Sequence, residues 1–234
     1  MLVAAAVCPH PPLLVPEAMG AAGSQRNGGM EEVRAACDAA VAGLAAAEPD
    51  AVVVVGGART TAAYEGSAAG SLREYGVAYD IGRGEPVLPL SLTIGAWLLR
   101  RAGIGTTAGL RAVARATPPA ECFRIGAQIA RQAPRVAMLT MGDGPARRAM
   151  GIPGAADPTA EAYDAEVAAA LAVADAGGLA RLAPSLDDEL MVAGRAAWQV
   201  LAGAADGLQL RGRLRCATAQ YEVGYLVASW ELVR

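Results

Sequence analysis

Short, unbroken runs of apolar residues recur along the chain, and proline, glycine or charged residues bound them. The clearest runs cover residues 2–7, 51–55 and 135–141. Runs of this length without polar alternation are typical of strands that are buried on both faces of a largely parallel sheet. Because short crossovers place successive strands close together, we expect these three strands to lie side by side in one central sheet.

Between and after these runs, apolar residues recur at the spacing of an amphipathic helix. In the first such segment Val33, Cys37 and Val41 are four residues apart, which places them on one helical face. The segments with this pattern are 30–47, 90–101, 121–132, 159–174 and 187–202. Residues 208–217 and 221–230 alternate in the manner of a β-hairpin.

This alternation of buried strands and helices predicts the α/β class. We expect a single domain over residues 1–234, built as a sandwich whose central, largely parallel or mixed sheet is covered by helices on both faces. The sequence contains no internal repeat and no linker-like boundary.

Composition narrows the function further. The chain has 234 residues, 54% hydrophobic and 18% charged, and at this length it can bury a core without disulfides or metals. All 20 basic residues are arginine, which excludes lysine Schiff-base chemistry and the Walker phosphate lysine. A net charge of -3 without basic runs argues against nucleic acid as the partner.

The four cysteines, at positions 8, 37, 122 and 216, are widely spaced and form no Cys-x-x-Cys pair. We expect reduced thiols in a cytoplasmic protein. The first eight residues are apolar but have no basic start, which favours a strand over a signal peptide. No apolar run reaches the roughly 18 residues of a transmembrane helix, so no membrane is expected as a partner.

The only histidine, His10, lies in a Pro-His-Pro-Pro turn directly after the first predicted strand. Ligands of α/β sheets bind beyond the carboxyl ends of the strands, which is where His10 is expected. A proline-flanked imidazole suits a metal ligand or a general base. The alternative is a histidine that only caps the turn.

Three further segments place polar groups after strands or beside helices. The valine-rich strand ends in Gly57-Ala58-Arg59, and Arg59 could meet a carboxylate or phenolate in a pocket; no phosphate-binding glycine motif follows. Asp143 lies between two glycines after a strand. It is either a metal ligand or an Asx-turn residue. The acids at 187–189 are either helix-start residues or candidate ligands.

Taken together, these segments resemble the class III extradiol ring-cleavage dioxygenases and their Memo-like relatives. The resemblance rests on the strand followed by Pro-His-Pro-Pro, the Pro-Asp before the valine strand, and the strand followed by Gly142-Asp143. The stretch 157–164 and the closing segment 221–230 also match. The resemblance implies an Fe(II) site made of two histidines and one carboxylate, which binds a catecholic substrate together with O₂. It also implies a third histidine that acts as acid and base.

At the positions that matter most, the sequence departs from the family. His10 matches the first metal histidine, but Gly57-Ala58 stands where the second is implied, and Ala146 stands where the acid–base histidine is implied. The carboxylate matches Glu189, or falls near Gly194 if the register is fixed on Trp198 instead. Alanine has no lone pair to donate, so this chain alone does not assemble the iron site.

We therefore expect an impaired or inactive relative of the dioxygenases with weak or absent Fe(II) binding. The candidate metal residues are His10 and Glu189, and the candidate substrate-pocket residues are Cys8, Arg59 and Asp143. The alternative is a binding protein or partner subunit without oxygenase chemistry. A small aromatic molecule is the expected ligand, and a homo-oligomer or a partner subunit the expected assembly. We expect His10, Ala58, Ala146 and the region of Glu189 to line one cleft.

Overall fold

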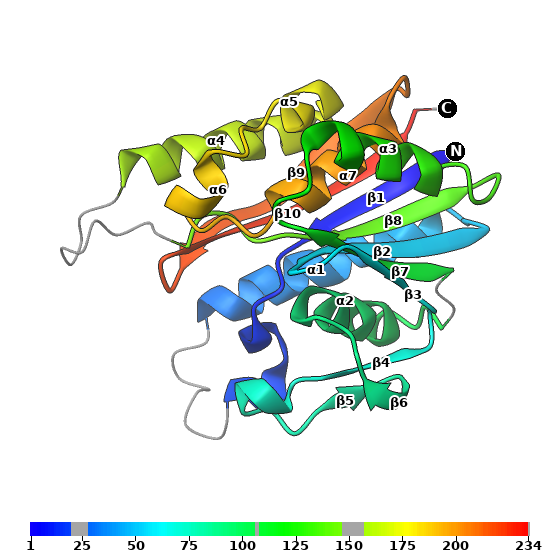
Figure 1. Cartoon of the computed structure of the whole chain (residues 1–234), viewed down its shortest axis with the longest axis vertical. Helices are drawn as coiled ribbons and strands as arrows, with labels where there is room; N and C mark the ends of the chain where they lie inside the picture. The colour runs from blue at the N-terminus through cyan, green and yellow to red at the C-terminus, as the bar shows by residue number, and fades with distance from the viewer. Residues whose placement is uncertain (20–27, 106–107, 147–156, 234) are drawn as a thin grey trace.

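The computed structural model describes residues 1–19, 28–105, 108–146 and 157–233. A sheet of seven strands runs through the middle (Figure 1). In spatial order they are β3 (Ala62–Tyr64), β7 (Gly109–Ala114), β2 (Ala51–Ala58), β8 (Val136–Met141), β1 (Leu2–Cys8), β10 (Val223–Leu232) and β9 (Leu210–Gln220). Strands β7, β2, β8 and β1 are parallel to one another, while β3, β10 and β9 are antiparallel to their neighbours.

Helices cover both faces of this sheet (Figure 1). One face carries α1 (Gly28–Ala46) and α2 (Leu90–Arg101), and the other carries α3 (Pro119–Ile129), α4 (Pro158–Val173), α5 (Ala176–Ala180) and α7 (Arg195–Ala205). In β2, Val53 and Val55 pack into one of the two cores and Val52 and Val54 into the other. The uninterrupted valine run thus serves two cores at once, and the predicted sandwich with a mixed sheet is confirmed.

The three strands predicted from the apolar runs are neighbours, with β8 between β1 and β2. The predicted hairpin is β9–β10, paired in antiparallel register from Leu210 and Leu232 to Gln220 and Val223. No helix in the described ranges is both long and apolar enough to cross a bilayer.

Several elements were not predicted. Strand β7 was missed because it is short and contains Arg111. A separate three-stranded sheet lies below α2 in Figure 1 and is made of β5 (Asp80–Ile81), β4 (Ala68–Ser71) and β6 (Arg83–Pro86). Short 3-10 helices lie at η1 (Pro12–Leu14), η2 (Pro16–Met19) and η4 (Arg73–Tyr75).

The predicted continuous helix over residues 187–202 is wrong. The chain forms α6 (Leu186–Glu189), leaves the helix, and starts again at α7. Met191 has a left-handed backbone, with φ of 54°, which a helix interior does not accommodate. The Val192 N–H then donates to the Asp187 carbonyl at 2.9 Å, and the break turns both Asp187 and Arg195 toward the interior.

Candidate functional site

Strands β1 and β8 end at the same level, strand β2 ends two residues beyond it, and the three parallel strands define one edge of the sheet. In the register of the sheet, Cys8 and Gly56 both pair with Met141. After β1 and β2 the chain continues to the α1 and α2 face, whereas after β8 it continues to α4 on the opposite face. Adjacent strands whose connections diverge in this way leave a crevice between them, which is where α/β proteins bind ligands.

A cleft of about 1430 Å³ opens at this edge. It is lined by side chains from several elements, among them His10, Ala58, Arg59, Arg115, Asp187 and Arg195. Tyr64, Tyr75 and Leu88 add aromatic and aliphatic surface. This mixture of apolar wall and a few convergent polar groups is typical of small-molecule sites.

His10 is held from behind by Asp143. The His10 backbone N–H donates to Asp143 Oδ1 at 2.7 Å, and the imidazole Nδ1 lies 3.5 Å from the same oxygen. His10 is 8% exposed. The two residues are 133 positions apart and meet because β1 and β8 are adjacent parallel strands. Asp143, predicted for the substrate pocket, is not among the lining residues of the cleft. Its carboxylate fixes the backbone of His10 and lies beside the imidazole, whose Nδ1 has no hydrogen-bond partner in the described part of the chain.

The loop that carries Asp143 is fixed by close backbone packing. A Cβ at Gly142 would lie 2.8 Å from Trp198 Nε1, so this position accepts only glycine. The Gly144 N–H donates to the Gly224 carbonyl at 2.8 Å, which ties the loop to β10. Burial, together with the charge of Asp143, raises the pKa of the Tyr225 hydroxyl. Asp143 is therefore placed by the fold and not by a flexible turn.

A buried ion pair forms one wall of the cleft. Arg195 Nε donates to Asp187 Oδ2 at 2.7 Å, and both side chains are almost completely buried. Burial raises the pKa of Asp187, and the hydrogen bond and charge of Arg195 act in the opposite direction. Asp188, by contrast, is exposed and pairs with Arg115 at 2.8 Å.

The expectation that four positions line one cleft is met in part. His10 and Ala58 line the cleft together, and Arg59 lies beside them. Glu189 is exposed and is not among the lining residues, and neither is Ala146, whose N–H donates to the Leu190 carbonyl at 3.0 Å. Of the 187–189 segment, Asp187 and Asp188 line the cleft, and only Asp187 is buried there. Its burial could not be read from three consecutive acids.

Cys8, predicted for the substrate pocket, lies elsewhere. It is fully buried between the sheet and α1, and it is not among the lining residues. It lies beside Cys37, and burial together with the nearby Cys8 thiol raises the pKa of Cys37 well above its ordinary value. All four cysteines are free thiols.

The side chains present do not fit the iron site that the resemblance implies. Within residues 1–19, 28–105, 108–146 and 157–233, no group of three or more histidine, cysteine or acidic side chains is placed to hold a metal ion. His10 is the sole imidazole of the chain, and the methyl group of Ala58 lines the cleft where a second imidazole is implied. A facial triad needs two imidazoles and a carboxylate.

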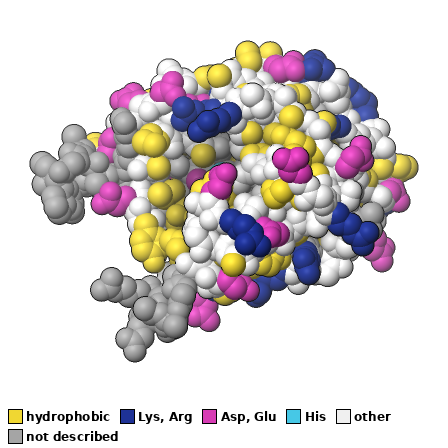
Figure 2. Space-filling model, turned by 60° about the horizontal axis from the view of Figure 1, so that its bottom comes forward, with side chains coloured by type: hydrophobic (Ala, Val, Ile, Leu, Met, Phe, Trp, Pro, Cys, Tyr) yellow, Lys and Arg dark blue, Asp and Glu magenta, His cyan; other side chains and the backbone are white. Residues whose placement is uncertain are grey.

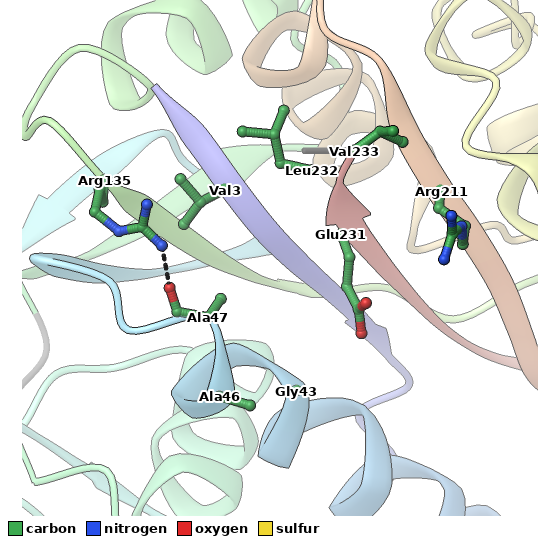
Figure 3. A pocket seen from close by; sticks show the side chains of 9 residues that line it. All are labelled: Val3, Gly43, Ala46, Ala47, Arg135, Arg211, Glu231, Leu232 and Val233. Atoms are coloured by element: carbon green, nitrogen blue, oxygen red, sulfur yellow. Dashed lines mark hydrogen bonds between the residues drawn. The ribbon is translucent and has the colours of Figure 1, made fainter.

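A second hollow, of about 480 Å³, lies at the opposite end of the sheet beside Val3 (Figure 3). Its Arg135 guanidinium is engaged with the carbonyls of Ala47 and Glu48. On the face shown in Figure 2, acidic and basic side chains are interspersed and form no large patch of one sign. The cleft at the carboxyl ends of the strands is therefore the stronger candidate site.

Comparisons with known proteins support the fold. No family model matches the sequence. No curated protein matches it either. A solved structure described as uncharacterized protein JW3007 from Escherichia coli K12 is similar, with a TM-score of 0.55 and 15% identity over 98% of this chain and 99% of that chain. At this identity the similarity concerns the fold alone.

Proposed function

We propose that this protein is a class III extradiol dioxygenase-like protein that binds a small aromatic molecule in its cleft and does not by itself carry out Fe(II)-dependent ring cleavage. The observation that carries the proposal is that Ala58 lines the same cleft as His10. The resemblance implies a metal histidine at this position, and a methyl group cannot donate a lone pair to a metal.

The walls of the cleft support binding of an aromatic compound. Tyr64 and Tyr75 provide ring surface, Leu88 provides aliphatic surface, and Arg59 brings a guanidinium. Aromatic side chains contribute packing energy beyond their buried area when they stack on another ring. His10, whose backbone N–H is bound by Asp143, adds one polar contact that a phenolic hydroxyl can use.

The donor set opposes ring cleavage. Iron held by one imidazole keeps mostly water ligands, and it then lacks the fixed geometry that brings a catechol and O₂ together. The missing acid–base histidine removes a further factor of about 10²–10⁴ in rate. The fold is therefore retained while the parent reaction is lost.

The test is restoration of the missing ligand in protein without a histidine tag. The Ala58→His variant, alone and together with Ala146→His, is compared with wild type for Fe(II) affinity and for oxygen uptake with catechol. We expect Ala58→His to bind Fe(II) at least tenfold more tightly than wild type, since it adds a second imidazole to the cleft of His10.

Ala120→His is the matched control, because Ala120 is an exposed residue of α3 away from the cleft and the variant has the same number of histidines. Equal Fe(II) affinity of the Ala58→His and Ala120→His variants would show that a histidine at position 58 does not bind a metal together with His10. Tight Fe(II) binding by wild type would contradict the proposal directly.

A further inference from the structure

The ion pair in the cleft wall belongs to a hydrogen-bond network around the Arg195 guanidinium. The Arg195 guanidinium donates to Asp187 Oδ2, to the Thr117 carbonyl at 3.0 Å, to Gln199 Oε1 at 2.8 Å and to the Arg115 carbonyl. Its charge and four of its five N–H donors are therefore engaged within the protein. Arg195 therefore holds Asp187 in place, and most of its hydrogen-bonding capacity is used within the protein.

The second carboxylate oxygen of Asp187 is left unsatisfied by this network. Asp187 Oδ1 is buried and has no hydrogen-bond partner in the described part of the chain, although Asp187 lines the cleft and is only 4% exposed. The nearby Tyr163 hydroxyl does not satisfy it, since that hydroxyl is also without a partner. Buried carboxylate oxygens without a partner are rare because they are costly, and a hydrogen from a bound molecule would remove the cost.

The remaining charges of the cleft favour a ligand that donates hydrogens. Asp188 is paired with Arg115, as Asp187 is with Arg195. Glu74 and Glu85 also line the cleft, with Arg59 as the remaining cation, and none of these three has an ion-pair partner among the described residues. The balance is therefore toward negative charge, which disfavours an anion and favours hydroxyl or amino groups.

We propose that Asp187 is the specificity-determining acceptor of the cleft, where its Oδ1 takes a hydrogen bond from a hydroxyl or amino group of the ligand. Arg195 is the positioning residue that orients the carboxylate for this contact. The inference rests on the proposed function, namely that the cleft holds a small aromatic compound, and it specifies which aromatic compounds are accepted.

The experiment uses three rings of similar shape and titrates them calorimetrically into wild-type protein. Catechol offers two hydroxyl donors, 1,2-diaminobenzene offers amino donors, and 1,2-dimethoxybenzene offers none. We expect at least one of the two donor rings to bind at least tenfold more tightly than the dimethoxy ring, since a hydrogen bond to a buried charged group is worth that much. The better donor ring identifies which group the site prefers. Equal binding of all three rings would overturn the inference.

Substitution tests the same contact from the protein side. Asp187→Asn should weaken binding of the preferred donor ring by about tenfold or more and leave the dimethoxy ring unchanged. Asp206→Asn is the control, because Asp206 is exposed at the end of α7 and outside the cleft. The comparison of rings on wild type stands even if the Asp187 variant does not fold.

The outcomes separate the two proposals. If wild type binds none of the rings, the proposed function fails and the inference fails with it. If the rings bind but Asp187→Asn, folded by circular dichroism, binds the donor rings as wild type does, the inference alone fails. If the preference for a donor ring disappears in Asp187→Asn and persists in Asp206→Asn, both stand.

Discussion

The buried pair of Arg195 and Asp187 makes a quantitative prediction about stability. Arg195→Ala removes a side chain that is 1% exposed and leaves the Asp187 carboxylate buried without its counter-charge. Breaking a buried pair by removing one partner typically costs about 3–5 kcal/mol. The carbonyls of Thr117 and Arg115 also lose a donor. Water that enters the space of the lost guanidinium offsets part of these two costs. We therefore expect the free energy of unfolding to fall by about 4 kcal/mol.

The assay is urea denaturation followed by tryptophan fluorescence, since Trp97, Trp198 and Trp230 are all buried. With an m-value of about 2–3 kcal/mol/M for a chain of this size, the expected loss lowers the midpoint by about 1–2 M. Arg195→Lys should fall between wild type and Arg195→Ala, because it keeps the charge but not the planar set of donors.

Arg73→Ala is the matched control. Arg73 also pairs with an aspartate, Asp80, but both of these side chains are well exposed. Exposed ion pairs contribute little to stability, so the midpoint of Arg73→Ala should stay at the wild-type value. If Arg195→Ala shifts the midpoint no more than Arg73→Ala does, the reasoning about the buried pair is wrong.

Two further predictions concern the core. Burial raises the pKa of Cys122 from 9.0 to about 11, so about one Cys122 thiol in a thousand is ionised at pH 8. At this pH the native protein should resist an aromatic disulfide reagent, whereas the urea-unfolded protein should be labelled fully. The native state holds this proton more tightly, so its contribution to stability is present below about pH 9 and is lost as the pH rises toward 11. Prompt labelling of native protein at pH 8 would contradict the burial of the thiols. Gly126→Ala should destabilise the protein by about 1–3 kcal/mol despite alanine's better helix propensity, because the added Cβ would overlap the Val200 carbonyl. Gly43→Ala is the control, since its added Cβ has its nearest contact at 4.0 Å. This variant should have unchanged stability or be more stable by up to about 1 kcal/mol. Equal thermal midpoints for the two glycine variants would refute the close packing of α3 on α7.

The sequence pattern predicts the parts of the fold that depend on local periodicity. The valine run of β2 has to be buried on both faces, and the spacing of Val33, Cys37 and Val41 has to form a helix. The break at Met191 could not be predicted in this way, because the left-handed residue is not a glycine and its conformation depends on what Asp187 and Arg195 bury together.

The same distinction holds at the site. The strand-end rule places His10 and Ala58 correctly at one edge, since it depends only on chain direction. The contact of His10 with Asp143 spans 133 positions and needs the order of strands in the sheet. The choice of Asp187 over Glu189 depends on which side of a four-residue helix faces inward, and so short a helix has no periodicity to show it.

Catechol-dependent oxygen uptake by the wild-type protein tests the central claim most directly. The protein, purified without a histidine tag, is given catechol and Fe(II), and the oxygen concentration is followed beside a blank that contains Fe(II) and catechol alone. We predict that uptake stays at the rate of the blank, because His10 and the methyl group of Ala58 cannot hold iron in the geometry that ring cleavage needs. Uptake well above the blank, with a ring-opened product formed in proportion to the oxygen consumed, would contradict the account.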